Sequence, residues 1–273
     1  MKRAVFSLGV ALVASAAFGQ ALITDGTSSF GWTTAAALSA AANRTGTGGG
    51  ADHEFKVNGS VDQSFQNWWW YRVNGVNTRE FALSTQSNAP VVSGNHMTLS
   101  YREPEGFTST IMYTINNVNG SARVTGTNFI LNEGNNDLDI DFFNYLDFDM
   151  GGTAAGDSAS LASPNPAMRM LITDSAGLMS GEWRALDADN FQIGAFSAVR
   201  TLLTNAASDN LANTGDPFGP GDFTAAVQWH FTLAPGQQIA LQTTQILTPV
   251  PEPATMAALG LGFAALMRRR RRN

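Results

Sequence analysis

The fold is decided by residues 108–132, which read TSTIMYTINNVNGSARVTGTNFILN. Two runs rich in Thr, Ile, Val and Asn flank the dipeptide Asn119-Gly120. Asn-Gly is a strong signal for a two-residue hairpin turn, because both residues tolerate a positive φ. We therefore expect residues 108–118 and 122–132 to form two strands that pair antiparallel across this turn.

Short β-rich runs, separated by Gly, Asn, Asp, Ser and Pro, continue on both sides of this hairpin, and this pattern is typical of sandwiches and barrels. The sequence therefore predicts an all-β fold that resembles an antiparallel β-sandwich, with a jelly roll as one form of it. The expected strands are 54–58, 64–74, 79–85, 96–102, 108–118, 122–132, 137–149, 168–174, 182–186, 191–194, 223–234 and 237–247.

The last two strands are expected to form a hairpin through Pro235-Gly236. Alternation within 223–234 predicts a half-buried strand, with one bulky face and one more polar face. The bulky face holds Ala225, Val227, Trp229, Phe231 and Leu233, and the other face holds Ala226, Gln228, His230 and Thr232. Outside the strands we expect a helix at 197–206, a long loop at 208–222, and either helix or irregular structure at 33–43.

The N-terminus has the pattern of a secretory signal peptide. A basic start at Lys2 and Arg3 precedes an uncharged, apolar run over 4–18. As a helix this run is about 22 Å long, whereas a bilayer core is about 30 Å thick. Small residues near position 19 suit a signal peptidase, so the mature chain is expected to begin at Gln20 or Leu22. The alternative is an uncleaved N-terminal membrane anchor.

Charge and cysteine content exclude several classes of function. The 273-residue chain has a net charge of −6, but the two ends hold seven basic residues and one acidic residue, so residues 22–250 carry −12. An acidic domain of this kind gives no electrostatic reason to bind nucleic acid. The chain has no cysteine, which excludes disulfides, thiolate metal sites and a cysteine nucleophile.

The C-terminus has three consecutive parts. Pro251, Glu252 and Pro253 come first, and because proline fixes φ and removes a backbone donor, this segment should remain extended and accessible. An uncharged apolar run over 254–267 then predicts a transmembrane helix. Five arginines follow, just before the last residue, Asn273, and should stay on the cytoplasmic side, which leaves the preceding domain outside. They are Arg268, Arg269, Arg270, Arg271 and Arg272.

This tripartite tail resembles the PEP-CTERM sorting signal of Gram-negative bacteria. The resemblance implies recognition by an exosortase, a membrane-embedded cysteine transpeptidase, and cutting near the Pro-Glu-Pro triplet. It also implies export by the general secretory route, transient tethering to the inner membrane with the main domain in the periplasm, and then surface attachment or release. The family is associated with bacteria that make exopolysaccharide. A plain tail anchor without processing is the alternative.

These features divide the chain into four parts. We expect a signal peptide at 1–21, an N-terminal arm with a glycine-rich linker at 22–50, one β-sandwich domain at 51–248, and the sorting and anchor segment at 249–273. The glycine tract at 46–50 is the reason for separating the arm from the sandwich.

Alternating carboxylates suggest a calcium site. On a strand, Asp137, Asp139 and Asp141 would project from one face, and hard oxygen ligands suit Ca²⁺. The spacing does not match an EF-hand loop, since Phe142 stands where glycine is needed and Phe148 where glutamate is needed. The alternative is a solvated polar face, with Leu138, Ile140 and Phe142 in the core. No other cofactor is expected.

Four consecutive aromatic residues suggest a carbohydrate-binding surface. Trp68, Trp69, Trp70 and Tyr71 place large rings on both faces of one strand. Exposed rings could stack against sugars of an exopolysaccharide, whereas the ordinary interpretation is packing in the core.

Catalytic signatures are absent from the sequence. His53, His96 and His230 lie far apart and show no metal-ligand spacing, and no G-x-S-x-G or phosphate-loop motif occurs. A carboxylate pair such as Glu103 and Glu105 could serve a secreted glycan hydrolase. The sequence favours a noncatalytic surface or biofilm-matrix protein, with a carbohydrate-binding module and a glycan hydrolase as alternatives.

Overall fold

The computed structural model describes residues 20–34, 38, 44–45, 50–164 and 167–250. The predicted signal peptide, the tail from Pro251 onward, most of 33–43 and the glycine tract at 46–49 lie outside these residues. The described part is an antiparallel β-sandwich with one short α-helix, which confirms the predicted fold class.

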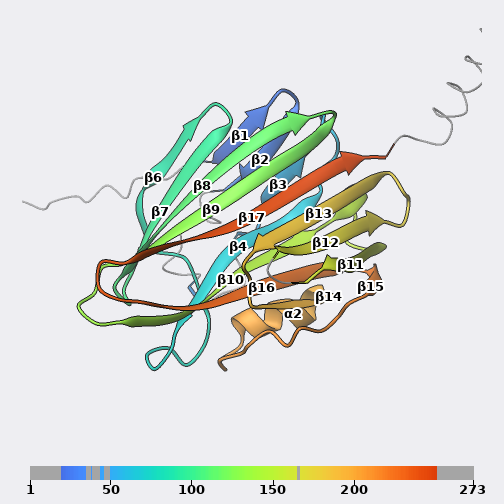
Figure 1. Ribbon diagram of the computed structural model, residues 1–273. Coiled ribbons are helices and arrows are strands. Elements are labelled where there is room, and N and C mark those ends of the chain that lie inside the picture. Colours follow the sequence, from blue (N-terminus) through green and yellow to red (C-terminus); the bar gives the residue numbers. More distant parts are fainter. Residues whose placement is uncertain (1–19, 35–37, 39–43, 46–49, 165–166, 251–273) are drawn as a thin grey trace, which may run out of the picture.

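One layer of the sandwich is a nine-stranded sheet (Figure 1). Its strand order is β15-β11-β12-β13-β17-β9-β8-β7-β6. The strands are β6 (Gln86–Ser93), β7 (His96–Glu103), β8 (Phe107–Val118), β9 (Ser121–Asn132), β11 (Asp157–Ser163), β12 (Ala167–Asp174), β13 (Met179–Leu186), β15 (Phe218–Gly221) and β17 (Gln238–Pro249).

The second layer is a five-stranded sheet of order β14-β16-β10-β4-β5. Its strands are β4 (Ser64–Val73), β5 (Phe81–Ala82), β10 (Leu138–Phe148), β14 (Asn190–Ala195) and β16 (Phe223–Leu233). The helix α2 (Phe196–Thr204) lies against the side of this sheet that faces away from the nine-stranded sheet (Figure 1). The predicted helix was 197–206, so the observed helix begins one residue earlier and ends two residues earlier than predicted.

A third, small sheet changes the predicted division of the chain. Strands β1 (Ala21–Asp25), β2 (Ser28–Trp32) and β3 (His53–Lys56) pair in that order. Residues of β1 and β2, among them Ile23 and Phe30, are buried in the same hydrophobic core as the sandwich. The segment predicted as a separate arm is therefore part of the folded domain in its first strands.

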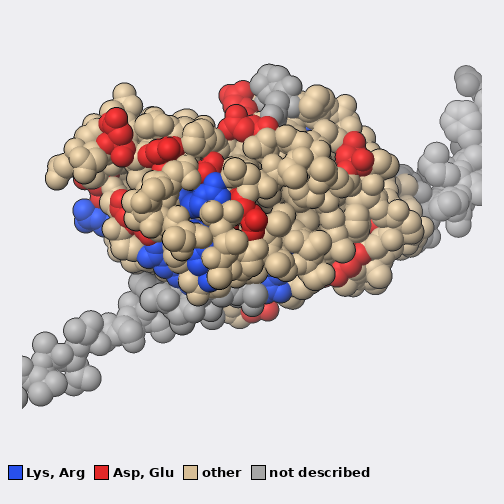
Figure 2. Space-filling view, turned by 90° about the horizontal axis from the view of Figure 1, so that it is seen from below, with Lys and Arg blue, Asp and Glu red and all other residues tan. Residues whose placement is uncertain are grey.

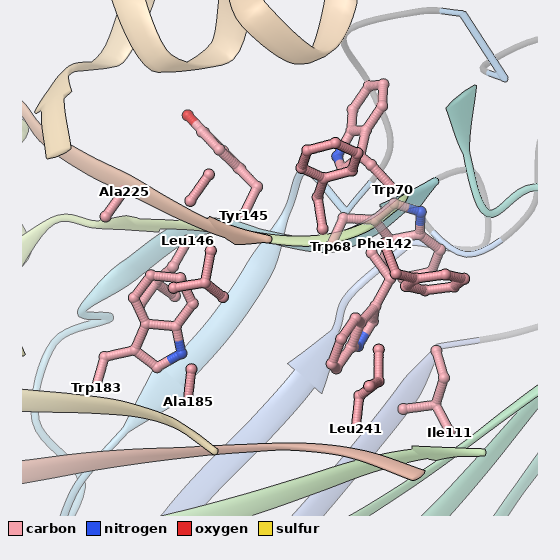
Figure 3. Close-up of a cluster of buried hydrophobic side chains, with 14 of the residues drawn as sticks. Trp68, Trp70, Ile111, Phe142, Tyr145, Leu146, Trp183, Ala185, Ala225 and Leu241 are labelled. Atoms are coloured by element: carbon pink, nitrogen blue, oxygen red, sulfur yellow. The ribbon is translucent and has the colours of Figure 1, made fainter. Parts of the chain in front are cut away.

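The main core lies between the two large sheets (Figure 3). Trp183, Leu241 and Ile111 project from the nine-stranded sheet toward Phe142 and Leu146 of the five-stranded sheet. Alternate residues of β7, β8 and β9 are buried, as expected for strands with one face in the core and one in solvent. Leu138, Ile140 and Phe142 are buried as predicted.

The hairpin at 108–132 forms as predicted. Strands β8 and β9 pair antiparallel, from Phe107 opposite Asn132 to Val118 opposite Ser121. Asn119 and Gly120 have φ values of 52° and 83°, as the two-residue turn requires.

The predicted C-terminal hairpin is wrong. Strands β16 and β17 follow each other through Pro235-Gly236 but belong to different sheets, because β16 pairs with β10 and β14 while β17 pairs with β9 and β13. The turn therefore carries the chain across the sandwich. The local turn signal is correct, but strand partners depend on distant segments that the turn does not encode.

The first part of β16 is buried on both faces, which differs from the predicted half-buried strand, whereas His230 and Thr232 of the predicted polar face are exposed. Ala226 and Gln228, expected on the polar face of β16, are buried along with their bulky neighbours. The helix α2 and the segment after it cover this outer face, since the backbone amide of Leu211 donates to the side chain of Gln228.

Other differences are smaller. The sequence did not indicate β1, β2, β6, β11 or β15, and the predicted strand 79–85 is reduced to β5. Within the described residues no helix has both the length and the apolar character that a bilayer crossing requires. The predicted transmembrane helix at 254–267 is outside these residues.

Candidate functional site

Three carboxylates meet at one end of the five-stranded sheet. Asp147 is the penultimate residue of β10, Asp149 follows that strand, and Asp222 lies between β15 and β16. A carboxylate oxygen from each lies within 4.8 Å of the other two. We call this group the acidic cluster. It joins segments that are more than seventy residues apart in the sequence.

Local backbone structure explains how the end of β10 and the turn after it supply two of these groups. The register of β10 against β4 shifts between Asp147 and Phe148, and Phe148 is fully buried. The backbone amide of Asp149 donates to the carbonyl of Gln63 at 3.0 Å. The chain then turns through the short 3-10 helix η1 (Met150–Gly152), where Gly151 has φ of 75°. This turn ends the strand and leaves Asp149 half-buried beside Asp147.

Burial and mutual repulsion raise the pKa values in the acidic cluster. Burial raises the pKa of Asp147 to about 8, with further increases from Asp149 and Asp222 and a decrease from Arg200. Burial, followed by repulsion from Asp222 and Asp62, raises the pKa of Asp149 to about 6. Burial also raises the pKa of Asp222. The fold therefore concentrates negative charge where it is poorly solvated.

The acidic cluster lines a small pocket of about 210 Å³. Phe65 and Phe196 form its apolar wall, with ring centroids 6.0 Å apart in an edge-to-face arrangement. Phe65 is 42% exposed, so the pocket opens to solvent beside it. A pocket of this volume has room for water or an ion beside the carboxylates.

The raised pKa values predict a pH-dependent stability. An unfolded aspartate has a pKa near 3.8, so stabilisation from protonated Asp147 is complete below that pH and is lost as the pH rises through about 8. With a chelator present, we expect Asp147→Asn and wild type to have the same melting temperature near pH 4. Toward pH 8 the melting temperature of Asp147→Asn should exceed that of wild type by an increasing amount. Thermal melting monitored by circular dichroism across this pH range measures the difference. A difference that is constant with pH would contradict the prediction.

The three residues of the predicted calcium site are not arranged as a shared site. Asp137 precedes β10 and is exposed, Asp139 is half-buried, and Asp141 is buried. Asp141 accepts from Arg72 at 2.5 Å, from Gln228 at 2.9 Å and from Asn74 at 3.0 Å. Burial opposes its ionisation, but these three bonds hold its pKa below the ordinary value. Asp141 is therefore paired with the guanidinium group of Arg72.

The four aromatic residues of β4 are all buried, each with 1% exposure or less. Trp69 stacks against Trp229 at 5.7 Å, and Trp68 donates from its indole nitrogen to the carbonyl of Leu83 at 2.9 Å. Tyr71 donates toward the carboxylates of Glu103 and Glu105. No ring of this group is presented to a sugar in the structure.

The groups considered for catalysis are also used internally. Glu103 is buried and accepts from the backbone amides of Ser84 and Thr85, while Glu105 pairs with Arg44. His53 lies 2.8 Å from the Ser64 hydroxyl, but burial lowers its pKa to about 3. A histidine with this pKa is a weak general base at neutral pH.

A larger polar groove lies on the nine-stranded sheet, with a volume of about 460 Å³. Arg123, Arg169 and Arg184 contribute to its lining. Glu182 forms ion pairs with both Arg169 and Arg184, which neutralises part of this basic charge. On the face shown in Figure 2, acidic side chains are spread along the molecule and basic ones lie mainly in one half.

Sequence reasoning did not identify the acidic cluster, since the residues it proposed for calcium were Asp137, Asp139 and Asp141. The Asp147-Phe148-Asp149 alternation is visible in the sequence, but Asp222 lies in what was predicted as a loop. Its place beside β10 follows from the pairing of β16 with β10, in which Asp147 is opposite Thr224.

The fold and the tail together define a β-sandwich protein that carries a C-terminal sorting segment. Residues 249–272 match the model of the PEP-CTERM protein-sorting motif. The chain therefore ends in a PEP-CTERM motif, which implies export, cell-surface sorting and exosortase processing. The match begins at the last residue of β17, so the motif starts where the sandwich ends. No curated protein matches the chain.

Solved structures with a similar architecture are distant. A bacterial glucoamylase complexed with acarbose has 8% identity and a TM-score of 0.48, over 75% of this chain and 29% of its own. A polysaccharide lyase has 12% identity and a TM-score of 0.48, over 84% and 34%. A protein of Escherichia coli K12 assigned as an aldose 1-epimerase has 9% identity and a TM-score of 0.46, over 85% and 99%. The chain spans about a third of the first two, and these similarities assign no activity to it.

Proposed function

We propose that this protein is an exported, noncatalytic component of the cell surface or biofilm matrix, delivered by its PEP-CTERM tail. In this proposal a signal peptidase removes the N-terminal segment and an exosortase processes the tail at the inner membrane. The β-sandwich then acts outside the cell through binding or matrix structure. The observation that carries the proposal is the sorting motif at 249–272, directly after the last strand of a complete sandwich.

The geometry supports a noncatalytic role. Glu103, Glu105 and Asp141 are held in internal ion pairs or hydrogen bonds, and His53 has a pKa too low for general base catalysis at neutral pH. Polar groups that already have partners within the protein favour a structural role for these side chains over a catalytic one.

Processing of the tail is the first test. In the native host, Glu252→Ala is expected to leave most of the protein in the membrane fraction with residues 254–273 attached, because the motif is then incomplete. Mass spectrometry of the C-terminal peptide gives the result. Pro249→Ala, which leaves the triplet intact, is the matched control and should be processed like wild type. Wild-type protein that keeps Asn273 at the surface would refute exosortase processing and favour a plain tail anchor.

The carbohydrate-binding alternative now depends on a surface other than Trp68–Tyr71. The groove lined by Arg123, Arg169 and Arg184 is the feature that favours it, since guanidinium groups bind carboxylated sugars. Retention of the exported protein on the host's exopolysaccharide, lost on changing Arg184 to Ala, would support this alternative. Release of reducing ends from a polysaccharide would instead support the hydrolase alternative.

A further inference from the structure

The acidic cluster has a feature that a solvated acidic surface lacks. Asp147 is only 1% exposed, and its Oδ1 atom has no hydrogen-bond partner. A buried carboxylate oxygen without a donor has lost its hydration without compensation, so such groups are normally paired or coordinate a metal. The same carboxylate lines the pocket that Asp149 and Asp222 share. The unpartnered oxygen therefore belongs to a group that lines the pocket.

We propose that Asp147, Asp149 and Asp222 bind one divalent cation, Ca²⁺ by preference, which fastens the end of β10 to the connection between β15 and β16. Their oxygens, within 4.8 Å of one another, are close enough to contact one ion. Ca²⁺–oxygen distances are about 2.3–2.6 Å, so two ligands of the same ion lie no more than about 5 Å apart.

The positive charge nearby does not balance these carboxylates. Arg200 lowers the pKa of Asp147, and its guanidinium carbon lies 4.7 Å from the centre of the Phe196 ring. One guanidinium supplies a single charge against three carboxylates. Asp157 adds to the repulsion, and its own Oδ1 is buried without a partner. A dication supplies the missing charge at the centre of the group.

The ligand chemistry selects the ion. Carboxylate oxygens with water completing the shell suit a hard cation, and Ca²⁺ accepts about six to eight oxygens in flexible geometry. Mg²⁺ requires a near-ideal octahedron, and Zn²⁺ prefers nitrogen and sulfur ligands. The choice of Ca²⁺ also rests on the proposed export, because extracellular sites function with dissociation constants of about 10⁻⁴–10⁻³ M. Binding itself is independent of export and is measured on purified protein.

Thermal melting and calorimetry test the site on the exported protein after treatment with a chelator. With 10 mM Ca²⁺, the wild-type melting temperature is expected to rise by about 3–10 °C, and titration should give one ion per chain. Asp147→Asn keeps the size of the side chain but removes its charge, and it should abolish both the shift and the binding heat. Asp137→Asn, an exposed aspartate before the same strand, is the matched control and should retain both.

Asp222→Asn provides a second variant, because Asp222 is half-buried and reaches the acidic cluster from a different segment of the chain. It should also abolish the shift. Wild-type protein without a Ca²⁺-induced shift or binding heat would overturn the site, and so would binding that survives Asp147→Asn and Asp222→Asn. An equal shift with Mg²⁺ would overturn the preference for Ca²⁺. None of these results depends on whether the tail is processed.

Discussion

Replacing Arg72 by methionine is expected to lower the free energy of unfolding by about 3–5 kcal/mol. Arg72 is 5% exposed and forms ion pairs with Glu80 at 2.6 Å and Asp141 at 2.5 Å, which are themselves buried. It also donates to the backbone carbonyl of Asp209, which holds the segment after α2 against the sheet. Methionine fills similar volume but leaves two buried carboxylates without their cation. Urea unfolding monitored by tryptophan fluorescence measures the loss.

The exposed pair of Arg102 and Glu133 is the matched control for this prediction. Its nitrogen and oxygen are 2.9 Å apart, but the Arg102 side chain is 69% exposed. Arg102→Met should therefore change the free energy of unfolding by less than about 1 kcal/mol, since water solvates both charges well. Losses of equal size in the two variants would show that burial of the Arg72 network contributes nothing beyond a surface ion pair.

Replacing Trp69 by alanine is expected to cost about 3–5 kcal/mol of unfolding free energy. Its ring lies between the two large sheets, in contact with Phe142 and stacked on Trp229. Its indole nitrogen donates to the hydroxyl of Tyr113 on β8 at 2.9 Å. The substitution leaves a cavity and a buried hydroxyl without its donor. Urea unfolding of the purified protein measures both effects together.

Two further variants separate these effects. Trp69→Phe keeps most of the ring volume and loses the hydrogen bond, so it should cost less than Trp69→Ala. Tyr113→Phe removes the same hydrogen bond from the other sheet and should show non-additivity when combined with Trp69→Phe. A Trp69→Ala variant as stable as wild type would mean that the ring is not part of the core. Because the variant is expected to be destabilised, lost polysaccharide retention in it would not identify a sugar site.

The strand content was largely predictable because it depends on local patterns. The β8–β9 hairpin follows from Asn119-Gly120 and the β-rich runs beside it, and the short helix after β14 follows from the spacing of Val199, Leu202 and Leu203. Some of the missed strands lack the alternation of buried and exposed residues, as in β6, whose residues are mostly exposed. Others contain residues that are unusual in strands, as in β15 with its Pro and Gly.

The candidate site was less predictable because it depends on sheet membership. A strand with aspartates at alternate positions predicts one polar face, and the prediction placed Asp137, Asp139 and Asp141 there as a solvated face or a calcium site. The fold instead buries Asp141 against Arg72, because α2 and the following segment cover that face of the five-stranded sheet. Trp70 and Phe143, which pair with each other in the same two strands, are also buried.

By itself, the sequence determined that this protein is built from antiparallel strands and ends in a sorting tail. Both properties are encoded in contiguous residues: turn dipeptides and alternation for the strands, and the Pro-Glu-Pro triplet with its apolar and arginine segments for the tail. Only the tertiary structure decided that β16 and β17 lie in different sheets and that Asp222 meets Asp147 and Asp149. Those outcomes depend on contacts between segments far apart in the chain, because a strand pairs with the neighbours that bury its apolar residues, and these neighbours are distant in sequence.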